Sequence, residues 1–214
     1  MSSVMLQSVN TGALARLSPT SRSRTGIRKL PVGGPVLCDA VGILGDAVGN
    51  TKHHGGPDQA VYLYAADDYA WWSTTLGREC PPGLFGENLT ISRWWDAPRI
   101  GDRVQFGDVV LELTAPRIPC STLATRMQDP QFVHTFARAD RPGAYARVIR
   151  AGTLEAGMRG DIVRGDPSWP TVLQLFRLWL DTPRSTGAII DALRAPVARR
   201  LRDTFLQWAA AGSP

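Results

Sequence analysis

The sequence has few cysteines and no long apolar run. Its 214 residues include three cysteines, Cys38, Cys80 and Cys120, which are too few and too scattered for a disulfide framework. No apolar stretch approaches the roughly 18 residues that span a bilayer. The first seven residues lack both the charged and the apolar segment of a secretion signal. We therefore expect a cytoplasmic protein with reduced thiols and no membrane association.

The sequence also has very little lysine. Of its 24 cationic residues, 22 are arginines and only Lys29 and Lys52 are lysines, with a formal net charge of +5. The arginines are spread along the chain without a dense block, so nucleic acid is not the expected partner. The planar guanidinium group suits phosphates and carboxylates, and an anionic ligand such as a phosphorylated cofactor therefore fits this composition.

No motif for a self-contained metal or redox centre is present. The sequence contains neither H-E-x-x-H nor C-x-x-C, the common zinc-binding patterns. It also carries no flavin, haem or iron–sulfur motif. If the protein catalyses a redox reaction, its electrons must come from an external donor protein.

The pattern of short strands punctuated by glycine predicts a mainly β fold. Strands are expected at residues 4–9, 36–41, 60–64, 89–91, 104–106, 109–114, 144–150 and 162–164. Strands at a spacing of about 8–12 residues are typical of a barrel or sandwich. No βαβ rhythm is visible, which argues against a parallel sheet. We predict one β domain over residues 1–166, with a helix near residues 67–76 whose aromatic face packs into the core.

After Pro167 the pattern changes to helices. Thr171-Val172-Leu173-Gln174 has the form of a capping box and begins a helix that reaches Leu180. A second helix is expected over residues 187–194, and Pro196 is predicted as the first residue of a third. Residues 167–214 are therefore predicted to be a three-helix extension. Its apolar stripes must pack together, on the β domain or on a second subunit, so a homodimer is one option; a DNA-binding helix-turn-helix is the less favoured alternative.

The most informative stretch is Pro116-Arg117-Ile118-Pro119-Cys120, which follows the most strand-like run of the sequence. Two prolines restrict the backbone and favour a rigid loop. A nearby cation can lower the pKa of a cysteine from about 8.5 to about 3.5–7.5. Cys120, three residues from Arg117, is therefore a candidate nucleophile or soft metal ligand. The alternative is a buried thiol with a packing role.

Two other stretches are candidates for ligand binding. In His54-Gly55-Gly56-Pro57-Asp58, the glycines allow positive φ angles and a close approach of the backbone to a ligand. His54 could orient a bound group, or it could only close a turn. Glu87 and Asn88 precede a predicted strand, and the amide of Asn88 offers one donor group and one acceptor. Asn88 could equally be a turn residue.

Taken together, these stretches resemble the MOSC family, the domain found at the C-terminus of molybdenum cofactor sulfurases, and in particular its YiiM-like branch with a three-helix extension. The resemblance covers almost the whole chain. The matching pieces occur in order along the sequence: residues 25–36, Gly45-Asp46, residues 54–64, residues 85–89, Gly101-Asp102, residues 116–120 and residues 144–152.

The resemblance implies a MOSC-type β-barrel with a small C-terminal α-helical bundle, and it implies molybdenum cofactor (Mo-molybdopterin) as the ligand. Cys120 is at the position of the family's expected molybdenum ligand. Arg117 then stabilises an anion or the thiolate, and His54 orients cofactor or substrate, which makes Cys120, Arg117 and His54 the candidate catalytic residues. The remaining candidate cofactor-binding residues are Gly55, Gly56, Glu87 and Asn88.

The implied function is an oxidoreductase that reduces small N-hydroxylated compounds, such as bases and amidoximes, with electrons from an external donor protein. One alternative is a persulfide sulfur carrier that acts through Cys120. Another is a non-catalytic module whose arginine-rich C-terminal helices bind a partner or nucleic acid. The chain departs from the family pattern at Val48 and Asn50, where a glutamine and an acidic residue are usual, so the substrate is not implied.

Overall fold

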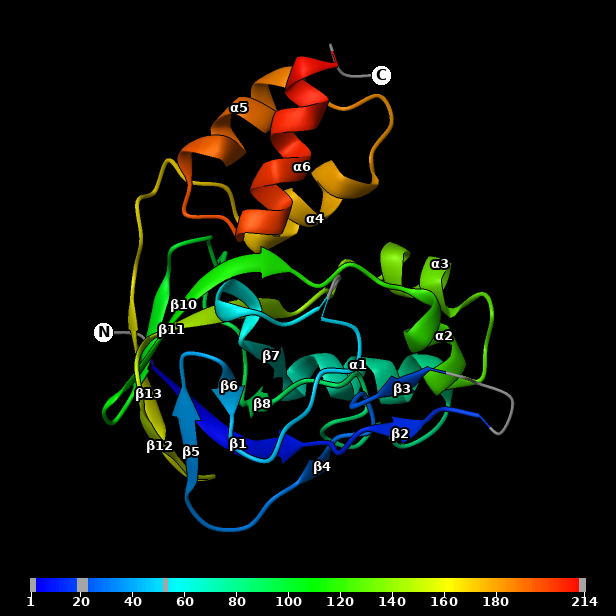
Figure 1. The fold of residues 1–214 in the computed structure, drawn as a ribbon, viewed down its shortest axis with the longest axis vertical. Coiled ribbons are helices and arrows are strands. Elements are labelled where there is room, and N and C mark those ends of the chain that lie inside the picture. Colours follow the sequence, from blue (N-terminus) through cyan, green and yellow to red (C-terminus); the bar gives the residue numbers. More distant parts are fainter. Residues whose placement is uncertain (1–2, 19–22, 52–53, 212–214) are drawn as a thin grey trace.

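The chain forms a closed β-barrel with a bundle of helices at one end (Figure 1). The computed structural model describes residues 3–18, 23–51 and 54–211. Seven strands pair around the barrel in the order β13, β9, β10, β11, β7, β8 and β1, and β1 pairs back onto β13. The barrel strands are β1 (Ser3–Thr11), β7 (Val61–Ala65), β8 (Leu89–Ile91), β9 (Arg103–Phe106), β10 (Val109–Pro116), β11 (Ala144–Arg150) and β13 (Arg159–Val163). The predicted fold class, a β-barrel with a C-terminal helical bundle, is confirmed.

Shorter strands extend the barrel at its margins. β4 (Leu30–Pro31) adds to β1, and a side sheet has the order β12 (Gly152–Leu154), β5 (Val36–Asp39) and β6 (Gly42–Ile43). A small hairpin pairs β2 (Ala15–Arg16) with β3 (Arg24–Thr25). Cys38 of β5 has no exposed surface, as expected for a core thiol.

One pair of barrel strands departs from the expected antiparallel pattern. β7 and β8 run parallel, and the chain between them contains helix α1 (Ala66–Leu76). Parallel neighbours need a crossover, and α1 supplies it. This strand–helix–strand unit is not recognisable in the sequence, because β8 has only three residues and a long loop follows α1.

The alternation of side chains explains how these segments form strands. In β9, Arg103 and Gln105 are exposed, whereas Val104 and Phe106 are buried inside the barrel. β10 is buried almost throughout, because one face lines the barrel interior and helices cover the other. Such a strand shows as a continuous apolar run, which is why it was the clearest strand in the sequence.

A second core lies beside the barrel and consists mainly of aromatic side chains. Helices α1, α2 (Ser121–Met127) and α3 (Phe132–Arg138) surround it. Its fully buried rings belong to Tyr62, Tyr64, Trp72, Phe85, Phe132, Phe136 and Phe176. The aromatic face of α1 packs into this core, as predicted, whereas α2 and α3 were not expected.

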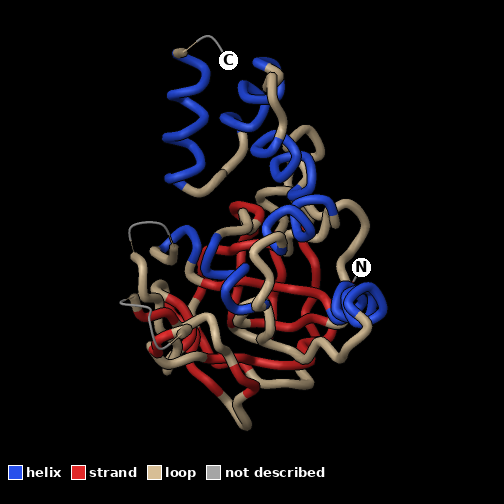
Figure 2. The backbone as a smooth tube through the Cα atoms, turned by 90° about the vertical axis from the view of Figure 1, so that its right-hand side faces the viewer, coloured by secondary structure: helices blue, strands red, loops and turns tan. Residues whose placement is uncertain are grey.

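The C-terminal helices stack above the barrel in both views (Figures 1 and 2). They are α4 (Val172–Leu180), α5 (Thr186–Arg194) and α6 (Arg199–Ala210). The capping box of α4 is present, since Thr171 and Gln174 exchange hydrogen bonds. Most of their buried residues belong to the same apolar core as the barrel interior, whereas Phe176 of α4 packs into the aromatic core. No helix among the described residues is long and apolar enough to cross a membrane.

Helix α6 begins later than predicted. Its N-cap is Ala198 rather than a residue next to Pro196. The backbone N–H of Ala198 donates to the carbonyl of Thr114 on β10 at 3.0 Å. This contact holds the preceding residues in an extended path against the barrel, so the first helical turn starts at Arg199.

Candidate functional site

Cys120 lies where strand β10 ends and helix α2 begins. Pro116 ends the strand, and the loop from Arg117 to Cys120 follows it directly. Cys120 is half-buried, whereas Cys38 and Cys80 are buried away from it. The stiff loop predicted from the two prolines therefore presents one accessible thiol at the end of the barrel.

The surroundings of Cys120 favour the thiolate. Burial alone would raise its pKa, but a hydrogen bond from the His54 side chain and the positive charge of Arg117 lower it, as does the backbone N–H of Leu123. The net effect lowers the pKa of Cys120 to about 6. Most of the sulfur is therefore ionised at neutral pH, which makes it a nucleophile and a soft metal ligand.

Arg117 is buried among aromatic rings. Its side chain is only 6% exposed, and its guanidinium carbon lies 5.2 Å from the centre of the Tyr62 ring. Its positive charge also acts on the Tyr145 side chain, where it opposes the rise in pKa that burial causes. Its Nε atom is buried without a hydrogen-bond partner among the described residues. A buried donor in this state is costly, so the site fits an anionic or carbonyl oxygen from a ligand.

The His-Gly-Gly loop brings His54 to Cys120. The backbone N–H of His54 donates to the carbonyl of Asn50 at 2.9 Å. Gly55 has a φ of 66°, which side-chain-bearing residues adopt rarely, and a Cβ atom there would lie 3.1 Å from Val48. Gly55 lines a cavity beside Cys120, whereas Gly56 does not and instead precedes the short 3₁₀ helix η1 (Pro57–Gln59).

Asp58 ties this loop to the barrel and to the helical bundle. Its carboxylate accepts the backbone N–H of Arg199 at 2.9 Å and pairs with Arg147 at 3.1 Å. Its carbonyl accepts the hydroxyl of Thr114 at 2.5 Å. These contacts give the acidic residue of the His-Gly-Gly-Pro-Asp motif a positioning role for the loop that carries His54.

Glu87 and Asn88 occupy different surroundings. Glu87 is fully buried, and its carboxylate accepts hydrogen bonds from the Tyr69 hydroxyl, the Gly83 backbone and the Thr90 hydroxyl. It lines neither cavity beside Cys120. Asn88 does line one of them, and its amide oxygen accepts the backbone N–H of Tyr62 at 3.1 Å. The structure therefore places Asn88 at the cavity and Glu87 in the network behind it.

A buried ion pair that the sequence did not reveal supports Asn88. The ammonium group of Lys29 pairs with Asp46, and both side chains are less than a tenth exposed. Asp46 also accepts the Asn88 amide at 2.9 Å and the Gly12 backbone N–H at 2.9 Å. Burial lowers the pKa of Lys29, and the adjacent carboxylate of Asp46 opposes this effect. All three side chains line the same cavity as Arg117.

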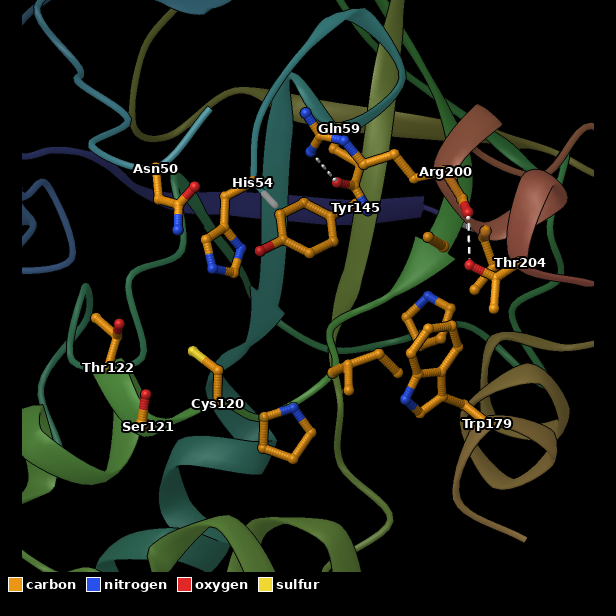
Figure 3. A pocket seen from close by; sticks show the side chains of 15 residues that line it. Asn50, His54, Gln59, Cys120, Ser121, Thr122, Tyr145, Trp179, Arg200 and Thr204 are labelled. Carbon is orange, nitrogen blue, oxygen red and sulfur yellow. Dashed lines mark hydrogen bonds between the residues drawn. The ribbon is translucent and has the colours of Figure 1, made fainter. Parts of the chain in front are cut away.

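Two cavities meet at Cys120. The inner cavity, about 160 Å³, lies between the barrel and residues 23–29 and 46–50, and its wall includes Lys29, Asn88 and Arg117. The helix-side cavity, about 440 Å³, lies between the end of the barrel and helices α4 and α6 (Figure 3). The residues that line both are Asn50, His54, Gln59, Cys120, Thr122 and Tyr145.

Figure 3 shows how the side chains face the helix-side cavity. Cys120 and His54 lie on one side, whereas Trp179, Arg200 and Thr204 project from the helical bundle on the other. Trp179 belongs to α4, and the other two belong to α6. The helical extension thus supplies part of the wall opposite the thiol.

The two positions that depart from the family pattern are both in the cavity walls. Val48 lines the inner cavity, and Asn50 lines both cavities. Val48 presents an apolar side chain and Asn50 a neutral amide to these walls.

The donor set at Cys120 suits a metal that brings its own ligands. The described residues contain no group of three or more histidine, cysteine or acidic side chains that could bind a metal ion by themselves. A single thiolate beside cationic and amide groups is compatible with a metal held mainly by an organic cofactor. The unpartnered Nε of Arg117 and the adjoining inner cavity fit such a group.

Comparison with known families identifies the domain. The family model for the MOSC domain matches residues 50–161, which include the His-Gly-Gly loop, Asn88 and the Cys120 loop. The chain belongs to the MOSC domain family. The family assignment made from the motifs is therefore confirmed.

Curated relatives of this MOSC chain cover different lengths. YflK of Bacillus subtilis is 32% identical over 144 residues, which are 66% of this chain and 65% of YflK. A protein of Gibberella moniliformis named "Reductase" is 34% identical over 219 positions, covering 96% of this chain but 36% of the fungal protein. YiiM of Escherichia coli is 26% identical over 136 residues, 62% of this chain and 61% of YiiM. The matches thus span less than two thirds of each relative.

Solved structures confirm the fold of the MOSC chain. YiiM from Geobacillus stearothermophilus superposes with a TM-score of 0.80 at 24% identity, covering 96% of this chain and 99% of that one. YiiM from Escherichia coli also gives a TM-score of 0.80, at 20% identity, with 100% and 95% coverage. The similarity covers nearly the whole chain and therefore includes the C-terminal helical bundle.

Sequence reasoning missed several residues of the site. Lys29 stood out in the sequence as one of only two lysines in an arginine-rich chain. Nothing in the sequence marked Tyr145 or Gln59 as site residues beyond their place near predicted strands. Trp179 lies on the apolar stripe of its helix and Arg200 among the arginines of the last helix, and neither position indicated that both residues line the helix-side cavity.

Proposed function

We propose that this MOSC chain binds molybdenum cofactor and reduces small N-hydroxylated compounds with electrons from an external donor protein. The observation that carries the proposal is an acidic thiol, Cys120, at the junction of two cavities and beside the buried Arg117. The fungal relative named "Reductase" supports a redox activity, because it contains a region similar to 96% of this chain within a much longer protein.

The residues divide into a cofactor side and a substrate side. Cys120 would hold the metal, and Arg117, Lys29 and Asn88 would contact the organic part of the cofactor in the inner cavity. When bound, the cofactor supplies the two-electron redox chemistry that cleaves the N–O bond. The helix-side cavity gives a substrate access to the same sulfur from the opposite direction.

The reaction also needs two protons, since R–NHOH, two electrons and two protons yield R–NH₂ and water. His54 and Tyr145 line both cavities together with Cys120. Burial raises the pKa of Tyr145, and Arg117 opposes this effect, so the phenol stays protonated at neutral pH. These two side chains are placed to bind the hydroxyl group and to transfer a proton to the departing oxygen.

The proposal is tested by the metal content of protein made in a cofactor-competent host. We expect Cys120→Ala to contain at least about tenfold less molybdenum than wild type, because a direct ligand is lost. Cys80→Ala is the matched control, since this thiol is buried elsewhere, and it should keep wild-type metal content. Equal molybdenum in wild type and Cys120→Ala would remove Cys120 as the ligand.

The low pKa of Cys120 also supports a second candidate function, a persulfide sulfur carrier. A thiolate can accept a sulfur atom from a cysteine desulfurase and pass it to an acceptor. Incubation with a desulfurase and cysteine, followed by mass spectrometry, separates the two functions. An adduct of about 32 Da on Cys120 in cofactor-free protein supports sulfur transfer, and its absence counts against it.

A further inference from the structure

Arg200 is a partly buried cation without a negatively charged partner. It extends from the first turn of α6 into the wall of the helix-side cavity and is half-buried. No salt bridge joins it to an acidic side chain among the described residues, although eleven such pairs occur elsewhere. A shielded guanidinium group without a counter-charge favours an anion from outside the chain.

The hydrogen bonds of Arg200 hold it in place but leave part of it unused. Its Nη1 donates to the carbonyl of Gly55 at 3.1 Å and to the side-chain oxygen of Gln59 at 3.4 Å. Its Nη2 donates to the carbonyl of Thr51. The guanidinium has five N–H groups, so Nε–H and one N–H on Nη2 have no acceptor among the described residues. These two nitrogens suit a carboxylate, which binds arginine through two parallel hydrogen bonds.

The positive charge of the helix-side cavity lies at its Arg200 end. The lining contains no aspartate or glutamate, and its acidic thiol, Cys120, lies at the other end. The nearest acidic residue on the loop, Asp58, already binds Arg147 and the backbone of Arg199. The Arg200 end of the cavity therefore favours an anionic group over a cationic one.

Part of the wall is apolar and includes one flat ring. Trp179 projects into the cavity from α4 (Figure 3). Ile118, Pro119 and Leu201 contribute aliphatic surface. The ring of Trp179 is held by Trp208, with 5.2 Å between ring centres. A fixed indole beside aliphatic groups suits a planar ring. The volume of about 440 Å³ is within the usual range for a small-molecule site.

We propose that the helix-side cavity selects planar N-hydroxylated substrates that carry a carboxylate, which Arg200 binds while the ring lies against Trp179. This inference rests on the proposed reductase function, since it places the substrate of that reaction. Arg200 is then a specificity-determining residue supplied by the helical extension. The cavity extends from Arg200 to Cys120, so one molecule can contact both ends.

Turnover of three matched substrates tests the charge preference. The substrates are benzamidoxime, its 4-carboxylate and its 4-trimethylammonium derivative, reduced by the holoprotein with a chemical reductant. We expect kcat/KM for the carboxylate to exceed that for the cation by at least about tenfold in the wild type. The ratio should fall to about one in Arg200→Gln, and Arg200→Lys should retain part of it.

Comparing substrates within each variant removes the effect of a loosened loop. Arg200 also binds Thr51, Gly55 and Gln59, so Arg200→Gln can slow all three substrates, but such a general loss cancels in the ratio. Arg202→Gln is the matched control, because Arg202 lies on the same helix and binds the carbonyl of Leu193 instead. Its ratio should equal that of the wild type. Equal kcat/KM for the three substrates in the wild type would overturn the inference and leave the proposed reaction standing.

A binding measurement separates this inference from the proposed reaction. The probes are 4-carbamoylbenzoate and neutral terephthalamide, titrated into the protein by calorimetry. We expect the carboxylate to bind at least about tenfold more tightly, and this advantage should disappear in Arg200→Gln. If no amidoxime is reduced while the carboxylate still binds through Arg200, the proposed reaction fails and the anion site stands. Equal affinity of the two probes in the wild type contradicts the site.

Discussion

At pH 7, Cys120 should react with iodoacetamide at least about 100-fold faster than Cys38. The pKa of Cys120 is lowered to about 6, whereas burial, with a smaller contribution from Asp39, raises that of Cys38 to about 12. The thiolate fractions at pH 7 then differ by about five orders of magnitude, and the lower intrinsic nucleophilicity of the more acidic thiolate offsets about half of this. Cys38 also has no exposed surface.

The measurement is a time course of alkylation followed by peptide mass spectrometry between pH 5 and pH 9. The rate at Cys120 should rise with pH, with a midpoint near 6, and level off above pH 7, because only the thiolate reacts. His54→Ala should move the midpoint upward, since a hydrogen bond to the thiolate is lost. His134→Ala is the control, because His134 is exposed on α3 and lines neither cavity. A wild-type midpoint above about pH 8 would contradict the acidic thiol.

Lys29→Met should destabilise the protein by about 3–5 kcal/mol, because it leaves the buried carboxylate of Asp46 without its counter-charge. The remaining hydrogen bonds, from Gly12 and Asn88, do not replace a cation. Equilibrium unfolding in urea measures the loss as a lower midpoint. An unchanged midpoint would mean that Lys29 and Asp46 are not buried as a pair.

Two controls show whether the loss comes from the unpaired charge. Arg159→Met breaks an ion pair with Asp161 in which both side chains are more than half exposed, so it should change stability by less than about 1 kcal/mol. The double variant Lys29→Met/Asp46→Leu removes both charges. It should recover part of the stability lost in the single variant, since no uncompensated charge remains.

The fold was predictable because its signals are local. Strands such as β9 alternate between exposed and buried residues, β10 shows as an apolar run, and the capping box of α4 lies within four residues. The candidate thiol was predictable for the same reason, since Arg117, the prolines and Cys120 belong to one short loop. Each of these features depends on neighbours in the sequence.

The rest of the site depends on contacts between distant residues. Lys29 meets Asp46 and Asn88 only after the barrel closes, and Arg200 reaches the carbonyl of Gly55 across 145 positions of sequence. Helices α2 and α3 are short and lie between proline and glycine residues, so their periodicity is weak. Their aromatic and aliphatic side chains become a helical face only when packed against α1.

The contact between α6 and the His-Gly-Gly loop has a consequence for engineering and for evolution. The last 48 residues form one wall of a cavity that the barrel alone leaves open. Removing them would therefore expose Cys120 to solvent. Exchanging these C-terminal residues between relatives would change the wall opposite Cys120 and leave the thiol itself unchanged. Homologous chains can thus diverge in what they accept while the interior of the barrel stays under the same packing constraints.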